Sequence, residues 1–184
     1  MNLRAIAGVL PLVVFFWQVV GASAAFSPVS RGSGSGLISG LISLGFVGLI
    51  VGSNASSPHT WIIAAGVLGL IGALALFEWA RRSIRGRFFS YVFSSDTPSF
   101  LHTRGPFAYV RNPFYTSYLL SMASTALMRP ALHRWLIVIA AVVYFHIAAM
   151  FEERKFAGSA VAQEYEEYKR RTGRFVPKVF QRSG

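Results

Sequence analysis

The chain has 184 residues, of which 53% are hydrophobic and 14% charged, and it carries a net charge of +11. This composition excludes an ordinary soluble domain and predicts a polytopic membrane protein. The basic residues lie beside apolar segments rather than along one polar face, so the charge indicates membrane topology and no nucleic-acid partner. The absence of cysteine excludes disulfides and thiolate metal sites, and we expect no metal site.

Five apolar segments approach the length of about 20 residues that a helix needs to cross the hydrocarbon core. They run from Ile6 to Phe26, Leu37 to Val51, Trp61 to Ala80, Phe114 to Met128 and Trp135 to Phe151. The second and the fourth are short for a full crossing. We predict an all-α membrane bundle of about five transmembrane helices, with N-terminal helices in residues 1–80. Residues 81–184 hold the polar motifs, a helix hairpin and a cytosolic helical tail.

The second and third segments carry small residues at close spacing, which allow membrane helices to approach each other closely. The pairs are Gly36 and Gly40, Gly48 and Gly52, and Gly66 and Gly69. We therefore expect these two segments to form a packed helix pair without a chemical role.

Counting Lys and Arg predicts the orientation of the bundle. With five spans, one side holds fifteen basic residues: Arg31, six arginines from Arg81 to Arg111, and eight basic residues from Arg154 to Arg182. The other side holds three, which are Arg4, Arg129 and Arg134. The N-terminus is therefore expected outside and the C-terminus in the cytosol.

The first segment also has features of a secretory signal, with Ala22-Ser23-Ala24 as a candidate cleavage site. Cleavage would leave two spans before the Arg81 to Arg87 cluster and would place that cluster outside. Because the charge rule disfavours this outcome, we expect the first helix to be retained.

The start of the fourth segment has more polar and aromatic residues than anchoring requires. Asn112 followed by Pro113 predicts a helix start, because Asn is a good N-cap and Pro is tolerated at the first helical position. The first backbone N–H groups, with Arg111 beside them, would form an anion site. Five aromatic residues surround it: Phe107, Tyr109, Phe114, Tyr115 and Tyr118. On this stretch alone, an interfacial aromatic belt with a snorkelling arginine explains the pattern equally well.

The fifth segment ends in two adjacent carboxylates, Glu152 and Glu153. Only a few residues join it to the fourth, so the two helices should form an antiparallel hairpin with the carboxylates beside the anion site. Two solvated glutamates balanced by Arg154 and Lys155 are the alternative reading of the pair.

The tail continues with QEYEEYKRRTGRFVP. Tyr165 and Tyr168 are three residues apart and should share one face of a helix. The residues from Arg174 to Pro177 then end that helix. Taken alone, this segment is a basic amphipathic helix on the inner leaflet.

The ordered set of motifs resembles the isoprenylcysteine carboxyl methyltransferase and phospholipid methyltransferase superfamily, which are integral membrane enzymes using S-adenosyl-L-methionine. The resemblance covers Trp79 to Pro177. It rests on Gly105-x-Phe107, Arg111-Asn112-Pro113-x-Tyr115, Glu152-Glu153, Tyr165-x-x-Tyr168 and Arg174-Phe175-x-Pro177.

The resemblance implies that the cofactor lies at the cytosolic face, between the hairpin and the tail. Its expected binding residues are Leu101, His102, Gly105, Phe107, Asn112, Pro113, Tyr115, Glu152 and Glu153. Arg111 and Tyr115 are the expected catalytic residues. Carboxylates can hold the ribose hydroxyls or the methionyl amine, while helix N–H groups and Arg111 can hold the methionyl carboxylate.

The chain departs from the superfamily pattern at three places. Asn112 replaces the histidine of the prenylcysteine enzymes, and Val161-Ala162 replaces a Phe-Gly pair with one extra residue of spacing. Ala148 stands where those enzymes carry a substrate-binding arginine, which weakens the case for a prenylcysteine carboxylate as the acceptor.

The membrane location favours a lipid-like or prenylated acceptor. A carboxylate acceptor needs no base, whereas an amine must first lose a proton, for which His102, Tyr115 or Glu153 are candidates. His146, inside the fifth segment, is either functional or a neutral histidine hydrogen-bonded between helices.

Two other functions stay open at this stage. One is an NADPH-dependent membrane oxidoreductase similar to the sterol reductases, which carry a related Arg-His-Pro-x-Tyr motif. The other is a non-enzymatic membrane subunit on the same scaffold. The identity of the bound cofactor distinguishes both functions from that of a methyltransferase. The sequence does not indicate an oligomeric state.

Overall fold

The computed structural model describes residues 3–25, 46–49, 58–84 and 100–178. Within these ranges the regular secondary structure is helical, apart from an isolated parallel bridge between Val110 and Gly173, and turns and loops join the helices. The elements are α1 (Leu3–Ala25), α3 (Thr60–Ser83), the 3-10 helix η2 (Gly105–Ala108), α4 (Pro113–Met128), α5 (Leu132–Ala157) and α6 (Ala162–Arg171). The predicted all-α fold is confirmed.

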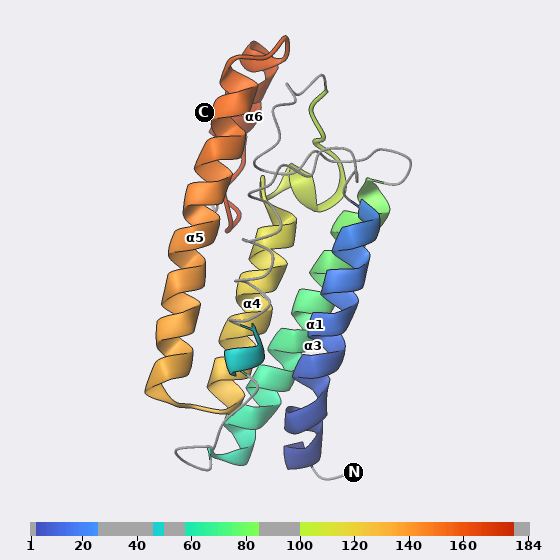
Figure 1. The fold of residues 1–184 in the computed structure, drawn as a ribbon. Coiled ribbons are helices and arrows are strands. Elements are labelled where there is room, and N and C mark those ends of the chain that lie inside the picture. The colour runs from blue at the N-terminus through green and yellow to red at the C-terminus, as the bar shows by residue number, and fades with distance from the viewer. Residues whose placement is uncertain (1–2, 26–45, 50–57, 85–99, 179–184) are drawn as a thin grey trace.

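The four long helices lie side by side, with α4 between α3 and α5 (Figure 1). α1, α3 and α5 run in one direction and α4 runs in the opposite one. The C-terminal ends of α1, α3 and α5 therefore lie at the same end of the bundle as the N-terminal end of α4 (Figure 1). η2 and α6 lie at this same end (Figure 1).

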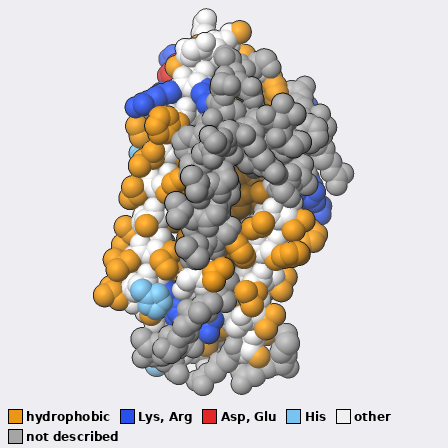
Figure 2. Space-filling view, in the orientation of Figure 1, with side chains coloured by type: hydrophobic (Ala, Val, Ile, Leu, Met, Phe, Trp, Pro, Cys, Tyr) orange, Lys and Arg blue, Asp and Glu red, His pale blue; other side chains and the backbone are white. Residues whose placement is uncertain are grey.

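Three helices, α1, α3 and α5, are long and apolar enough to span a membrane. Hydrophobic side chains line both flanks of the described helices (Figure 2). They include Val13 and Phe16 on α1, Leu68 on α3, and Leu136 and Ile139 on α5, all exposed. Such a surface is suited to lipid.

α4 is the interior helix of the bundle. It has 16 residues, which corresponds to about 24 Å of rise. Its buried polar residues Ser117, Ser121 and Thr125 donate hydrogen bonds to backbone carbonyls of α4 itself. Their hydroxyls are thereby satisfied away from lipid. Most of the predicted second segment lies outside the described residues, and its residues 46–49 are helical.

Gly66 and Gly69 of α3 face α4, and the predicted pairing of α3 with the second segment lies largely outside the described residues. A Cβ at Gly69 would lie 2.2 Å from Oγ of Ser124, and one at Gly66 would lie 2.2 Å from Cγ of Met128 and 3.0 Å from the carbonyl oxygen of Ser124. The small residues of α3 therefore allow close packing, here against α4. α4 also has a small residue, Ser124, at this contact, so the backbones of α3 and α4 can approach each other closely.

Gly66→Ala should lower the thermal stability of the protein relative to Gly72→Ala. A Cβ at Gly72 would have Leu120 as its nearest neighbour, at 3.9 Å, so the substitution there gains helix propensity of up to about 1 kcal/mol. At Gly66 the added methyl overpacks the contact, at a cost of about 1–3 kcal/mol. Thermal unfolding of both variants in detergent measures the difference. Equal midpoints would contradict the close approach of α3 and α4.

α1 is tied to the bundle by polar contacts near its C-terminal end. Nε1 of Trp17 donates to the Glu78 carboxylate at 2.7 Å, and Nε2 of Gln18 donates to Oγ of Ser121 at 2.9 Å. A Cβ at Gly21 would lie 2.6 Å from the ring of Phe77. Cleavage after the candidate signal would remove all three contacts.

Candidate functional site

The end of α5 meets the start of α4, as the hairpin prediction required. Oη of Tyr115 donates to Oε1 of Glu152 at 2.9 Å. The Tyr115 ring is buried and stacks on Phe145, with ring centroids 4.9 Å apart. The predicted neighbourhood of the acidic pair and the helix start is therefore confirmed.

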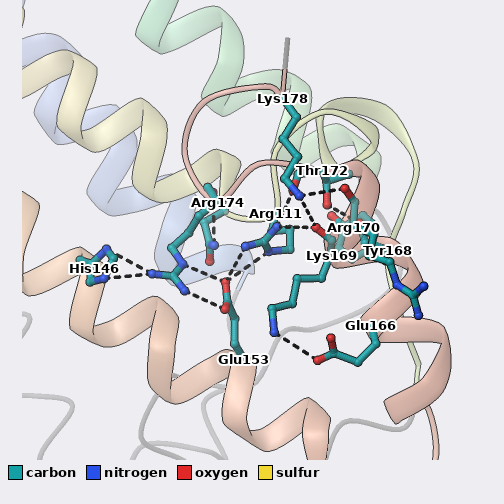
Figure 3. A network of polar contacts seen from close by, with 11 residues as sticks. Arg111, His146, Glu153, Glu166, Tyr168, Lys169, Arg170, Thr172, Arg174 and Lys178 are labelled. Carbon is teal, nitrogen blue, oxygen red and sulfur yellow. Dashed lines mark hydrogen bonds and ion pairs between the residues drawn. The ribbon is translucent and has the colours of Figure 1, made fainter. Parts of the chain in front are cut away.

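The two adjacent glutamates point in different directions. Successive residues of a helix are rotated by about 100°, so Glu152 turns toward Tyr115 and Glu153 turns toward the tail. Glu153 forms ion pairs with Arg111 at 3.1 Å and Arg174 at 2.9 Å. Figure 3 shows both guanidinium groups converging on this one carboxylate. Glu152 and Glu153 therefore differ in the partners available to them.

Arg111 joins three parts of the chain. Its Nε and Nη2 donate to Oε1 of Glu153 at 3.2 and 3.1 Å, while Nη1 donates to the backbone carbonyls of Thr172 and Lys169 (Figure 3). The side chain is only 8% exposed. Arg111 thus holds the start of α4 against the ends of α5 and α6.

The tail returns to pair with the residues just before α4. The N–H groups of Arg111 and Asn112 donate to the carbonyls of Gly173 at 2.8 Å and Arg174 at 3.1 Å, and Gly173 N–H donates to Tyr109 at 3.3 Å. A Cβ at Gly173 would lie 1.7 Å from the carbonyl oxygen of Val176, so this turn requires glycine.

The helix start at Asn112 and Pro113 is confirmed, but the capping bond is not formed. Asn112 occupies the N-cap position with Pro113 behind it, and its side chain makes no capping hydrogen bond. Its Nδ2 instead donates to the carbonyl of Arg174 at 3.3 Å. The prediction of a side-chain cap was wrong: a cap would use Oδ1 as an acceptor for helix N–H groups, whereas the side chain is oriented by its Nδ2 group toward the tail.

α6 packs on the site through the predicted tyrosine face. Tyr165 and Tyr168 are both buried, which confirms that they share one side of the helix. Burial raises the pKa of Tyr168 to about 12, so its hydroxyl stays protonated and donates to the Phe107 carbonyl at 2.6 Å. The ring of Tyr165 stacks on Phe156 of α5 at 4.5 Å.

The predicted cofactor residues before α4 gather on the end of α3. Gly105 has a positive φ of 63°, and a Cβ there would lie 2.1 Å from Oγ of Ser83. η2 can therefore approach α3 only with glycine at this position. Phe107 is buried, with its ring centroid 4.9 Å from that of His102 and 6.4 Å from that of Phe114. Leu101, at the start of this described segment, is half-buried.

Ala148 lies under the tail. It is 1% exposed and belongs to a buried cluster with Tyr115, Phe145 and Ala149, against which Phe175 packs. Oγ1 of Thr116 donates to the Phe175 carbonyl at 2.9 Å and fixes this position. Phe175 therefore packs on the cluster that contains Ala148, the position at which the prenylcysteine enzymes carry an arginine.

Within the described part of the chain, His146 contacts the tail. Nη1 of Arg174 lies 3.2 Å from Nδ1 and 3.0 Å from Nε2 of its ring (Figure 3). In the sequence, Arg174 belongs to the stop after the tail helix and to the Arg174-Phe175-x-Pro177 motif, and neither pattern indicates this contact. No local signal pairs the two, because they are 28 residues apart.

The sequence of the chain matches a known protein family. The phospholipid methyltransferase family model matches residues 60–162, more than half of the chain. The chain belongs to the phospholipid methyltransferase family. The match covers α3, η2, α4 and α5 and ends at the first residue of α6, so the paired segment containing Arg174 lies beyond it. No curated protein matches the chain. Family membership and the apolar helices make it a membrane methyltransferase.

Proposed function

We propose that this member of the phospholipid methyltransferase family uses S-adenosylmethionine to methylate a lipid-like acceptor at the cytosolic face of the membrane. The observation that carries the proposal is the position of Glu152. Its carboxylate lies at the hairpin junction, oriented by Tyr115, while the neighbouring Glu153 is paired with two arginines.

Glu152 and the expected binding residues before α4 fit the chemistry of this cofactor. A carboxylate accepts hydrogen bonds from an ammonium group or from ribose hydroxyls. The rings of His102 and Phe107 and the residues Leu101 and Gly105 can face a flat heterocycle. Asn112 and Pro113 place the start of α4 beside them. These residues would hold the cofactor, which supplies an electrophilic methyl group on a sulfonium when bound.

Methyl transfer requires orientation and exclusion of water more than acid–base chemistry. Tyr115 orients the Glu152 carboxylate, and its stacking on Phe145 keeps that side of the site apolar. Arg111 positions Glu153 and the tail. For an amine acceptor, His102 remains the candidate to take the proton. Ala148, at the position where the prenylcysteine enzymes carry a substrate-binding arginine, supports an acceptor other than a prenylcysteine carboxylate.

The distribution of charge supports a cytosolic location of the site. Arg81, Arg82, Arg154 and Lys155 lie at the last turns of α3 and α5, which share the end of the bundle that carries the site. The positive-inside rule places this end in the cytosol. The chain lacks cysteine, so a single cysteine introduced at Glu166 reports on its side directly. Labelling of that cysteine from outside intact cells would contradict the orientation.

Calorimetric titration of the detergent-purified protein with S-adenosylmethionine tests the cofactor. We expect micromolar binding of the cofactor and of its demethylated product, without binding of NADPH. Binding of NADPH alone would support the oxidoreductase, and no binding of either would support a non-enzymatic subunit. Incubation of membranes with radiolabelled cofactor tests the acceptor. A labelled product that stays in the aqueous phase would overturn the lipid assignment.

A further inference from the structure

We propose that His146 and Arg174 form a binding site for the phosphate of a membrane glycerophospholipid on the flank of α5. That this lipid is the methyl acceptor rests on the proposed function; the binding site itself does not. His146 is exposed on α5 among the exposed apolar residues Val142, Val143 and Ile147. A polar ring on a surface suited to lipid is costly unless it has polar partners.

The ionised groups around Glu153 carry a net positive charge. Arg111 and Arg174 share this single carboxylate, so the three groups carry one net positive charge. The hydrogen bond to Glu153 raises the pKa of Arg174, which keeps the guanidinium charged. Glu152 does not neutralise the group by contact, because it turns toward Tyr115.

Arg174 is the accessible member of the two arginines. Its side chain is 25% exposed, whereas that of Arg111 is 8% exposed. Nε and Nη2 of Arg174 bind the carboxylate of Glu153, and Nη1 lies against His146 (Figure 3). The guanidinium and the imidazole thus stand together at the surface of the bundle, where an anion can meet both.

Arg174 lies where the apolar part of α5 ends and its charged end begins, because its guanidinium contacts both His146 and Glu153. His146 and Glu153 are seven residues apart and lie on nearly the same side of α5, with about 10 Å of rise between them. Arg174 bridges the two levels. Phe151 is exposed, and the guanidinium of Arg154 lies 5.6 Å from its ring centroid, an arrangement typical of the membrane interface.

A phosphodiester with attached acyl chains suits this place better than a soluble anion. Phosphate oxygens accept charge-assisted hydrogen bonds from guanidinium and imidazole N–H groups. The exposed Val143 and Ile147 flank His146 and offer apolar contact to acyl chains. The lipid headgroup would then extend from Arg174 toward the end of α5 that carries Glu152.

Native mass spectrometry of the full chain in detergent tests the site, with dioleoylphosphatidylglycerol as the probe. Dioleoylglycerol has the same acyl chains without phosphate, and glycerol 3-phosphate has the phosphate without chains. We expect the phosphodiester lipid to bind more tightly than either. His146→Leu and Arg174→Gln should weaken its binding by about tenfold, the loss of one charge-assisted hydrogen bond. Leu136→Ala, an exposed apolar residue of α5 ten positions before His146, is the matched control and should bind normally.

His146→Leu keeps the test valid if Arg174→Gln loosens the tail, because His146 is exposed and makes no contact with Glu153 in the described hydrogen bonds. Equal affinity for dioleoylglycerol and the phosphodiester lipid would overturn the proposal. An unchanged lipid preference in His146→Leu, or equally tight binding of glycerol 3-phosphate, would also overturn it. Lipid binding without S-adenosylmethionine binding would refute the proposed function and leave this site standing.

Discussion

Replacing Glu153 with alanine should lower the free energy of unfolding by about 3 kcal/mol or more, because it leaves two guanidinium groups without their carboxylate. The pair with Arg111 is largely buried, with side-chain exposures of 8% and 11%. The tail should detach with it, since Arg174 is held by the same carboxylate. Thermal unfolding in detergent measures the stability, and trypsin cleavage after Arg174 or Lys178 measures release of the tail.

Glu166→Ala is the matched control for this experiment. It also removes a glutamate from an ion pair, but Glu166 and its partner Lys169 are 53% and 42% exposed. Exposed pairs contribute less than about 1 kcal/mol, so this variant should unfold almost like the native protein. If the two variants unfold at the same temperature and release the tail equally, Glu153 does not hold the site together.

Replacing Glu152 with glutamine should weaken S-adenosylmethionine binding by at least about 30-fold while leaving the fold intact. Glutamine keeps the shape and can still accept the hydrogen bond of Tyr115, but it lacks the charge that attracts an ammonium group. The expected loss corresponds to about 2 kcal/mol for a charged hydrogen bond. Calorimetry measures the affinity, and the unfolding midpoint shows that the structure is retained.

Glu164→Gln, on the exposed first turn of α6, provides the same chemical change away from the hairpin. It should bind the cofactor like the native protein. Native-like affinity in Glu152→Gln would show that the carboxylate at the hairpin junction is not a cofactor ligand. A loss in both variants would point to a general effect of charge instead.

Helix positions follow from apolar runs more closely than helix ends do. The fourth segment was predicted from Phe114 to Met128, and α4 runs from Pro113 to Met128, because an Asn-Pro pair marks a start in the local backbone. The fifth was predicted to end at Phe151, but α5 continues to Ala157. Charged residues such as Glu153 and Lys155 end an apolar run, yet they are good helix formers.

The different partners of Glu152 and Glu153 could not be derived from their adjacency. The sequence places two carboxylates at one level of the hairpin, but the rotation of α5 about its own axis decides which one faces Tyr115. That rotation depends on packing against α4, where Phe145 and Ala149 are buried. A one-residue shift of this face would exchange the two roles.

Contacts between distant parts of the chain had no local signature. Gln18 donates to Ser121 across 103 residues, and Arg174 reaches His146 across 28. In the sequence Gln18 is one polar residue in an apolar run. Its role becomes visible only when α1 lies against α4, because its side chain is then 1% exposed.

The pairing of the tail with the start of α4 affects when the site can form during synthesis. The carbonyls of Gly173 and Arg174 complete the backbone hydrogen bonds of Arg111 and Asn112, which are made about 60 residues earlier. The ribosome produces the chain from its N-terminus. The hairpin of α4 and α5 is therefore made before the tail segment that pairs with the start of α4. The site is therefore finished last, and a chain released before Gly173 has its helices but lacks the segment that closes them.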